Sequence, residues 1–422
     1  MIPTERRASH SEQDAGGGMH LRVFMTVFVA AIFLAGARDV RAAEAPGRYE
    51  GVLGGAEYWI DVPPDWNGGL VLYAHGWEGE GPGSGTLRGS PIDQHVERRG
   101  YASAASGYRA KGYRPDWFLL DLLALKAHFA DRFGMPRWTI VYGQSMGGHV
   151  AISSLELHPE AYQGALIECG VIDGVGQIDW LYAYTAAAAY FSGLPLLDTP
   201  RPEFDTLVNT KWLVAMGEPG YYTEAGKRFD SVIKQLSGGD VPLRRDGLAL
   251  RYIRNLIPRA PGSNADREFP RHADTRHVVY DIDPGLGIDP AMINREIQRV
   301  VPRPGARSYD ANPVFAELTG KIRAPVMSIH ETADLWVPLR LEQDYRRRAD
   351  KAGSSQLLVQ RTVRWPGHCS TENAVREAAF NDLVTWIETG SRPEGDDVFG
   401  DPGQLGLRWT PLRHPKDMVA AQ

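Results

Sequence analysis

Ser145 lies at the centre of a short segment, residues 143–147, that fits the pattern G-x-S-x-G. A serine nucleophile must project from a sharp turn between a strand and a helix, and glycine two positions to either side leaves room for that turn. An apolar, strand-like run at residues 138–142 precedes the segment, and a helix-like run follows it. This context favours a nucleophilic serine over an ordinary glycine-rich turn. The segment consists of Gly143, Gln144, Ser145, Met146 and Gly147.

His368 is the candidate base for this serine, because a hydroxyl is a poor nucleophile until a base takes its proton. The chain contains 12 histidines. His368 lies on a loop between the last predicted strand, residues 356–365, and the last predicted helix, residues 372–386. A side chain on such a loop can reach over the strand ends. The other histidines fall in the leader, in helices, at strand ends, in a charged stretch before the strand at residue 101, in an insertion or in the tail.

Asp334 is the candidate carboxylate that would orient His368 and stabilise its imidazolium form. It lies on the turn after a predicted strand, residues 325–330, and it precedes His368 by 368 − 334 = 34 residues. The carboxyl ends of strands form the functional edge of an open α/β sheet. Glu331 and Asp344 are rival carboxylates. The order serine, aspartate, histidine differs from the orders in chymotrypsin and subtilisin.

Attack on a carbonyl creates an oxyanion, which needs backbone N–H donors. The Met146 N–H directly follows the nucleophile at a predicted helix N-terminus. A second donor is expected from the loop after the strand-like run at residues 70–74, where Trp77 follows a His-Gly pair. We choose the Trp77 N–H as this donor. The Trp77 indole is also a candidate wall of the acyl pocket.

Strands alternate with helices along two blocks of the chain, which predicts an α/β fold with a mostly parallel sheet flanked by helices. A glycine pair at residues 54–55 predicts a hairpin at the start of the sheet. The predicted strands are residues 48–52, 56–62, 70–74, 101–108, 138–143, 165–169, 325–330 and 356–365, and the predicted helices are residues 116–133, 145–158, 180–191 and 372–386.

The alternation stops between residues 174 and 323, where tyrosine, proline and arginine are frequent and one helix is predicted. We interpret this segment as a helical cap inserted into the core. The predicted parts are an N-terminal extension and leader (1–42), the first part of the core (43–173), the cap (174–323), the second part of the core (324–390) and a tail (391–422). Aromatic residues of the predicted cap helix are candidate pocket walls, although packing inside the cap is the more common role. These residues are Trp180, Tyr182, Tyr184, Tyr190 and Phe191.

The chain resembles the α/β-hydrolases, and in particular secreted bacterial serine esterases. The resemblance covers about residues 48–173 and 323–388. It is carried by the segments at residues 75–76, 143–148, 332–334 and 367–368. It implies a sheet that begins with an antiparallel hairpin, and a cap inserted after the strand that follows the nucleophile helix. The loop after residue 76 lacks the triple glycine of some lipases, and Glu331 replaces a more common glycine.

Cys169 and Cys369 are the only cysteines, which excludes a disulfide-rich scaffold and a four-cysteine zinc site. Cys169 ends a predicted strand and Cys369 follows His368, so both are expected at one edge of the sheet. We expect a disulfide that pins the His368 loop, similar to a bridge beside the triad of tannase and feruloyl-esterase-like enzymes. In those enzymes a cysteine precedes the serine, whereas here Gln144 does. Two free buried thiols are the alternative.

The N-terminal region has the pattern of a signal peptide. A short positive region at residues 19–22 precedes an apolar run at residues 23–35, and the small residues Val40 and Ala42 occupy the positions that allow cleavage after Ala42. The run is shorter than a bilayer-spanning helix. We therefore predict export to the periplasm or beyond and no stable membrane span in the mature protein. An uncleaved anchor is the alternative, and the sequence leaves open whether Met1 or Met19 is the start.

The chain of 422 residues carries 46 basic and 52 acidic side chains, a net charge of −6. Without a basic excess a nucleic-acid binder is disfavoured. Asp281, Asp283 and Asp289 lack the closing glutamate of a calcium loop, so no metal or cofactor is predicted. The predicted substrate is a small-molecule or polymer ester, cleaved through an acyl-enzyme.

Other functions fit the same residues. The same triad can cleave an amide, a peptide or a C–C bond beside a ketone. A non-catalytic binding protein is disfavoured, because all three residue types are present in the expected order. The oligomeric state is not predicted.

Overall fold

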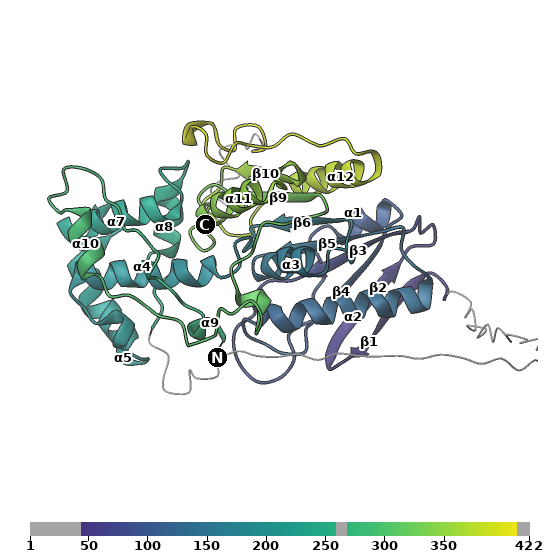
Figure 1. Ribbon diagram of the computed structural model, residues 1–422, viewed down its shortest axis with the longest axis horizontal. Coiled ribbons are helices and arrows are strands. Elements are labelled where there is room, and N and C mark those ends of the chain that lie inside the picture. The colour runs from purple at the N-terminus through teal and green to yellow at the C-terminus, as the bar shows by residue number, and fades with distance from the viewer. Residues whose placement is uncertain (1–43, 259–267, 412–422) are drawn as a thin grey trace, which may run out of the picture. The chain divides into compact units, whose positions relative to one another are not determined.

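Eight strands form one sheet in the order β1-β2-β4-β3-β5-β6-β9-β10 (Figure 1). The structure is a computed structural model that describes residues 44–258 and 268–411. The predicted leader and its cleavage position lie outside the described residues. The strands are β1 Gly47–Leu53, β2 Ala56–Val62, β3 Gly69–Ala74, β4 Ala102–Ser106, β5 Trp138–Gln144, β6 Gly164–Glu168, β9 Val326–Glu331 and β10 Leu358–Val363.

The sheet begins with the predicted antiparallel hairpin of β1 and β2. Gly54 and Gly55 form its turn with φ of 60° and 89°, which are conformations that favour glycine. β2 pairs antiparallel with β4, and the remaining neighbours in this sheet pair in parallel. The predicted mostly parallel α/β sheet is therefore confirmed.

The strand register aligns the carboxyl ends of the central strands. Gly143 of β5 pairs with Ala74 of β3 and with Ile167 of β6. Glu168 at the end of β6 pairs with Ile329 of β9. The loops that follow β3, β5, β6 and β9 therefore leave the sheet side by side, and these are the loops on which the site residues are predicted.

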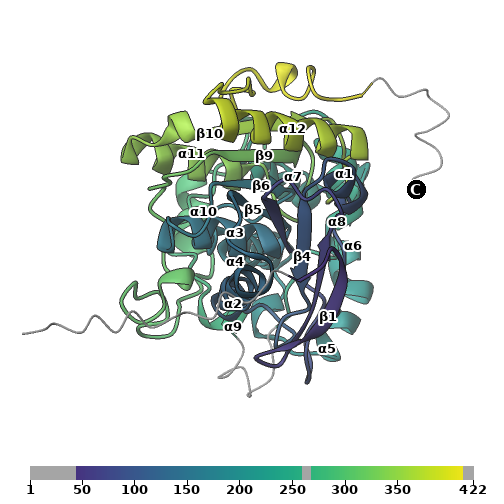
Figure 2. The ribbon, with the colours of Figure 1, turned by 90° about the vertical axis from the view of Figure 1, so that its right-hand side faces the viewer.

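Helices cover both faces of the sheet (Figure 2). Apolar side chains of α2, α3 and α11 pack on one face, and those of α1 and α12 pack on the other. The central strands are buried along their whole length, as parallel strands between two helical layers require. The helices are α1 Asp93–Arg98, α2 Pro115–Phe133, α3 Met146–Leu157, α11 Arg340–Ala352 and α12 Asn373–Thr389. Within residues 44–258 and 268–411, no helix has the length and apolar character that crossing a membrane requires.

The insertion between β6 and β9 is a cap of short helices beside one end of the sheet (Figure 1). The predicted helix at residues 180–191 is present with longer bounds as α4. The other cap helices were not predicted, and a two-stranded hairpin accompanies them. The cap contains α4 Gly176–Ser192, α5 Glu203–Leu207, a π-helical turn Val208–Trp212, α6 Leu213–Met216, β7 Gly217–Glu218, β8 Tyr221–Tyr222, α7 Glu224–Ser237, α8 Arg244–Arg251, α9 Glu268–Arg271 and α10 Pro290–Glu296.

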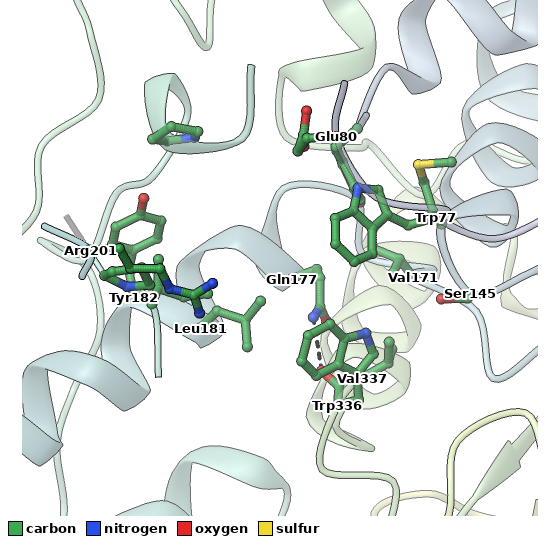
Figure 3. Close-up of a pocket in the computed structure, with 15 residues that line it drawn as sticks. Trp77, Glu80, Ser145, Val171, Gln177, Leu181, Tyr182, Arg201, Trp336 and Val337 are labelled. Atoms are coloured by element: carbon green, nitrogen blue, oxygen red, sulfur yellow. Dashed lines mark hydrogen bonds between the residues drawn. The ribbon is translucent and has the colours of Figure 1, made fainter. Parts of the chain in front are cut away.

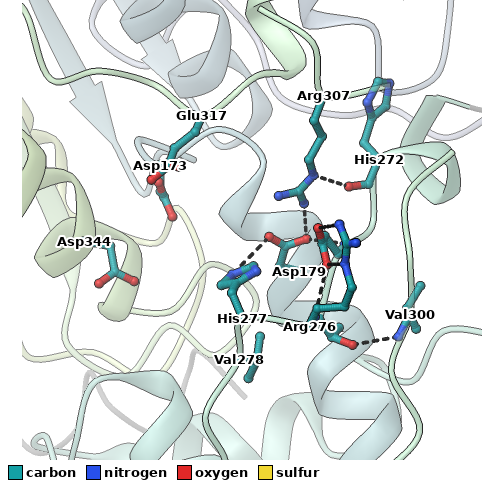
Figure 4. Close-up of polar contacts among 12 residues, drawn as sticks. Asp173, Asp179, His272, Arg276, His277, Val278, Val300, Arg307, Glu317 and Asp344 are labelled. Carbon is teal, nitrogen blue, oxygen red and sulfur yellow. Dashed lines mark hydrogen bonds and ion pairs between the residues drawn. The ribbon is translucent and has the colours of Figure 1, made fainter. Parts of the chain in front are cut away.

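Asp179, a buried carboxylate on α4, joins three segments of the cap (Figure 4). It accepts hydrogen bonds from the Arg307 guanidinium and, at 2.8 Å, from the Asp274 N–H. The His277 Nε2 lies 3.6 Å from its other oxygen. Burial raises the pKa of Asp179 to about 6, although the charge of Arg307 opposes this. One carboxylate thus joins α4 to the irregular loops that carry Asp274, His277 and Arg307.

The segment after α12 lies along β10, the last strand of the sheet. The Asp396 N–H donates to the Gln360 carbonyl at 2.7 Å, and the Asp396 carboxylate accepts the Thr362 N–H at 2.6 Å. Val398 and Leu405 are buried. An uncovered edge strand exposes unpaired backbone groups. The described part of the predicted tail therefore protects the edge of the sheet.

Candidate active site

Ser145 lies on the tight turn between β5 and α3, with φ of 54° and ψ of −122°. A residue other than glycine adopts this φ only with strain. A Cβ on Gly143 would clash with the Gly147 carbonyl, and a Cβ on Gly147 would clash with the Ala74 carbonyl. The two glycines therefore make the turn possible, and the turn presents the serine at the strand ends.

Ser145, His368 and Asp334 meet in one chain of hydrogen bonds. The His368 Nε2 lies 2.9 Å from the Ser145 Oγ, and the His368 Nδ1 lies 2.5 Å from the Asp334 Oδ2. The other oxygen of Asp334 accepts the backbone N–H groups of Trp336, at 2.9 Å, and Val337, at 3.1 Å. These two donors fix the carboxylate, and the carboxylate directs the Nε2 of the imidazole toward the serine.

The surroundings of His368 favour its protonated form. Burial lowers the pKa of His368, but the charge and hydrogen bond of Asp334 outweigh burial, with help from the charge of Glu331. The net result is a pKa above the ordinary value, although Arg251 acts in the opposite direction. An imidazolium is therefore stabilised where a proton from Ser145 would arrive.

Glu331, one of the two rival carboxylates, is buried at the end of β9 and holds the loop that carries His368. Its Oε1 accepts the Ser370 N–H at 2.6 Å and the Thr371 hydroxyl at 3.1 Å. Burial, together with repulsion from Asp334, raises the pKa of Glu331 to about 7. Asp344, the other rival, lies on α11 and takes no part in the hydrogen-bond chain. It pairs with two arginines of its own helix, Arg340 at 2.9 Å and Arg347 at 2.5 Å.

The expected disulfide between Cys169 and Cys369 is present in the structure and joins residues 200 positions apart. Both cysteines have positive φ, 45° and 53°. The Cys169 N–H donates to the Ile329 carbonyl at 2.9 Å, and Arg376 donates to the Cys369 carbonyl at 3.2 Å. The bond ties the loop of His368 to the end of β6, the strand beside β5.

A buried polar network that the sequence did not indicate lies beneath the serine turn. The Gln144 Nε2 donates to Glu168 at 2.7 Å, and the Gln144 Oε1 accepts the Tyr73 hydroxyl. Glu168 also accepts Arg376 at 2.8 Å and the Tyr142 hydroxyl. The network joins β3, β5, β6 and α12. Gln144 therefore holds the serine turn to the buried network and is not one of the residues that line the cavity.

The loop after β3 lies against Ser145. A Cβ on Gly76 would be 3.1 Å from the Ser145 Cβ, so glycine allows the backbone to approach this closely. The next residue, Trp77, is 47% exposed and lines the cavity beside the serine. Met146 begins α3, and the N–H groups of a first helical turn have no acceptor within the helix. Both residues predicted as oxyanion donors therefore adjoin Ser145.

A cavity of about 440 Å³ opens between the core and the cap, with Ser145 in its wall (Figure 3). Trp77 and Trp336 flank the end near the serine, and Tyr182 and Arg201 of the cap lie at the other end (Figure 3). Most of the lining side chains are apolar. A cavity of this size and character suits a small organic group.

The five aromatic residues of the predicted cap helix contribute little to the cavity wall, as expected from the more common role of packing inside the cap. Of the five, only Tyr182 lines this cavity. Tyr184 is buried inside the cap, where its ring lies 5.0 Å from that of Phe229. Sequence reasoning missed Trp336 and Gln177. Trp336 could have been found from its position, because it is a large aromatic residue two positions after Asp334. The sequence carried no signal for Gln177.

Strand order and site position together define the class of protein. The sheet begins with an antiparallel hairpin, the serine turn follows β5, the aspartate follows β9, and the histidine follows β10. The cap enters after β6, the strand that follows α3. The chain is an α/β-hydrolase in fold, as its resemblance implies.

The chain is similar to known proteins in structure but not in sequence. No protein-family model and no curated protein sequence matches the chain. The structure is similar to feruloyl esterase B from Aspergillus oryzae, with 13% identity, a TM-score of 0.44 and 82% of each chain covered. It is similar to proline iminopeptidase from Mycobacterium smegmatis, with 13% identity, a TM-score of 0.41, and 82% of this chain and 100% of that chain covered. It is also similar to an esterase from Pyrococcus furiosus, with 12% identity, a TM-score of 0.40, and 82% and 92% covered.

Proposed function

We propose that the protein is an exported serine hydrolase that cleaves carboxylic esters through an acyl-enzyme. Ser145 attacks the ester carbonyl and gives its proton to the His368 Nε2, while Asp334 stabilises the imidazolium. The N–H groups of Met146 and Trp77 bind the oxyanion. His368 then donates the proton to the leaving alcohol, and the acyl group stays on the serine.

Water completes the reaction in the second half. A water molecule gives a proton to the His368 Nε2 and attacks the acyl carbonyl, and the proton returns to the Ser145 oxygen as the acid leaves. The observation that carries the proposal is the hydrogen-bond chain from Asp334 through His368 to Ser145 in the wall of the cavity. The positive φ of the serine supports it, since a strained backbone is kept where a function needs it.

The proposed substrate class follows from the cavity. Its mostly apolar walls suit an organic acyl or alcohol group of modest size, or one unit of a polymer ester. Export is supported by the leader pattern and by the disulfide, because disulfides persist in oxidising compartments.

The experiment uses the mature protein and a 4-nitrophenyl ester. We expect a burst of nitrophenol equal to one acyl group per active chain, and covalent labelling of Ser145 by a fluorophosphonate. Ser145→Ala should keep its circular dichroism spectrum and lose both signals. Turnover that survives in this variant would refute the proposal.

A matched pair of substrates separates the ester from the amide. The 4-nitrophenyl ester and the 4-nitroanilide of the same acid share the acyl group and differ only in the bond that breaks. We expect the ester to be turned over faster even after correction for its greater intrinsic reactivity. A preference for the anilide after that correction would redirect the assignment to an amidase.

A further inference from the structure

Two sulfur atoms and one imidazole nitrogen lie together at the site. The Cys169 Sγ, the Cys369 Sγ and one nitrogen of the His368 imidazole are all within 4.8 Å of one another. Thiolate and imidazole are the ligands that zinc and similar soft cations prefer. While the disulfide is intact, the sulfurs carry no thiolate charge to offer. Their position becomes relevant when the bond is absent, as in a chain that has not yet been oxidised.

The distances suit a tetrahedral metal site. Zinc lies about 2.3 Å from thiolate sulfur and about 2.0–2.1 Å from imidazole nitrogen, which places sulfur and nitrogen about 3.5 Å apart at a tetrahedral angle. The Cys369 Sγ lies 3.5 Å from the His368 Nε2. Two sulfurs on one zinc lie about 3.8 Å apart at that angle. The Cα atoms of the two cysteines are 5.2 Å apart, and we expect rotation of the side chains to give the sulfurs this separation once the bond is reduced.

Contacts other than the disulfide hold the backbone of the three residues. The Cys169 N–H bonds to the Ile329 carbonyl in the sheet. On the loop of His368, Arg376 donates to the Cys369 carbonyl. Glu331 accepts the N–H of Ser370 and the hydroxyl of Thr371 on the same loop. These contacts do not depend on the sulfur–sulfur bond. The ligands are therefore expected to stay near one another after reduction.

Asp334 prepares His368 to be a metal ligand. A neutral His368 donates its Nδ1–H to this carboxylate, 2.5 Å away, so the Nε2 carries the free lone pair. A carboxylate behind a histidine is the usual outer partner of a zinc-binding imidazole. The same lone pair accepts the proton of Ser145, whose Oγ is 2.9 Å away. One lone pair cannot bind a metal and accept this proton at the same time.

We infer that the reduced chain binds one soft divalent cation such as zinc through Cys169, Cys369 and His368, and that disulfide formation closes this site. Reduction by a trialkylphosphine uses one water molecule, which supplies the oxygen of the phosphine oxide and the hydrogens of the two thiols. Metal binding then releases two thiol protons, and the sulfur lone pairs bind the cation. A cation on the His368 Nε2 occupies the lone pair that would accept the proton of Ser145. The resulting inhibition rests on the proposed function, whereas the binding does not.

The binding experiment uses cobalt as a coloured substitute for zinc. The mature protein is reduced with a trialkylphosphine, freed of it without oxygen and titrated with Co²⁺. We expect one ion per chain, with a sulfur-to-cobalt charge-transfer band and the visible bands of a tetrahedral site. The oxidised protein should show neither. His368→Gln removes one of three ligands and should weaken binding at least about tenfold.

Several results would overturn the metal site. Equal cobalt spectra from reduced and oxidised protein, or undiminished affinity in His368→Gln, would refute it. Cys169→Ser is a second test, because it removes a sulfur ligand and should lose the charge-transfer band of one thiolate. Near-ultraviolet circular dichroism follows the fold, and loss of the native spectrum on reduction would also refute the site, which requires the folded backbone.

The inhibition experiment measures ester turnover. A small excess of Zn²⁺ should lower the activity of the reduced protein at least about tenfold, and a chelator should restore it, while the oxidised protein changes less than about twofold. If zinc inhibited the reduced and the oxidised protein equally, the inference that the disulfide closes the metal site would be refuted. If neither form hydrolyses esters but cobalt still binds, the proposed function fails and the metal site stands.

Discussion

Glu331 illustrates how a residue outside the hydrogen-bond chain can act on it. The side chain is buried, its Oε1 fixes the loop after His368, and its charge raises the pKa of that histidine. Burial and the charge of Asp334 raise the pKa of Glu331 itself to about 7. Near neutral pH, its protonation state therefore sets part of the electrostatic field at His368.

Glu331→Gln should shift the pH dependence of catalysis. The amide oxygen can still accept the N–H of Ser370 and the hydroxyl of Thr371, but the negative charge is gone. Loss of this charge lowers the pKa of His368, so the acid limb of kcat/KM, where the base becomes protonated, should move to lower pH. The measurement is a pH profile of both proteins with one ester. An unmoved acid limb would contradict this role.

The same substitution should change how stability depends on pH. The pKa of Glu331 rises from an ordinary value of 4.5 to about 7 on folding, so its ionisation opposes the folded state. The wild type should lose stability as the pH rises from 4.5 to 7, by on the order of 2–3 kcal/mol from this group. Glu331→Gln should lack that loss. Urea unfolding at pH 5 and pH 8 tests this, and parallel losses in both proteins would contradict it.

At the scale of residues, the sequence predicts the candidates that have a local signature. Ser145 has its glycines, and Asp334 and His368 each follow a recognisable strand. Glu331 was recognised as a carboxylate near the acid, but its role depends on burial and on contacts 39 and 40 positions away. Such properties arise only when the chain has folded.

At the scale of elements, the strands were predictable because buried parallel strands are short, apolar runs. The cap helices were harder, since several have seven residues or fewer. The helix α7 did carry a signal: Thr223 caps it by accepting the Gly226 N–H at 3.1 Å, and Gly238 ends it. Its buried residues Phe229 and Val232 have helical spacing. The frequent tyrosine, proline and arginine residues of the region made this helical pattern hard to recognise in the sequence.

The turn between β5 and α3 predicts the effect of a single methyl group. Gly147→Ala places a Cβ against the Ala74 carbonyl, and no side chain there can move aside. We expect the free energy of unfolding to fall by more than about 3 kcal/mol. Gly400→Ala is the control, because its Cβ would meet nothing closer than 3.2 Å and its φ is not positive. Equal stability of the two variants in urea would contradict the steric argument.

At the scale of the whole molecule, the disulfide joins the two parts of the core that the cap separates in sequence. Cys169 lies before the cap and Cys369 lies after it. The loop between them includes α4 to α11 and the strands β9 and β10. The overall architecture was predictable from the interrupted alternation of strands and helices. The contacts between cap and core depend on side chains far apart in sequence, and these were not predictable.

Removing the disulfide should lower stability through the unfolded state. A bond that closes a loop of 200 residues restricts the unfolded chain and contributes about 5 kcal/mol in the chain-entropy model. We expect the doubly substituted chain, Cys169→Ser with Cys369→Ser, to lose about this much free energy of unfolding. Urea unfolding under oxidising conditions provides the measurement, with the reduced wild type as a reference. A loss below about 1 kcal/mol would contradict the model.

The covalent loop also has a consequence for a chain that has been cut. Cleavage of a peptide bond within the cap leaves Ser145 on one fragment and both Asp334 and His368 on the other. The sulfur–sulfur bond keeps the fragments together, so they should migrate as one band on a denaturing gel without reductant and as two bands with it. The sheet contacts that align the three side chains lie outside the cap. A cleaved molecule should therefore keep the hydrogen-bond chain and work as a two-chain protein.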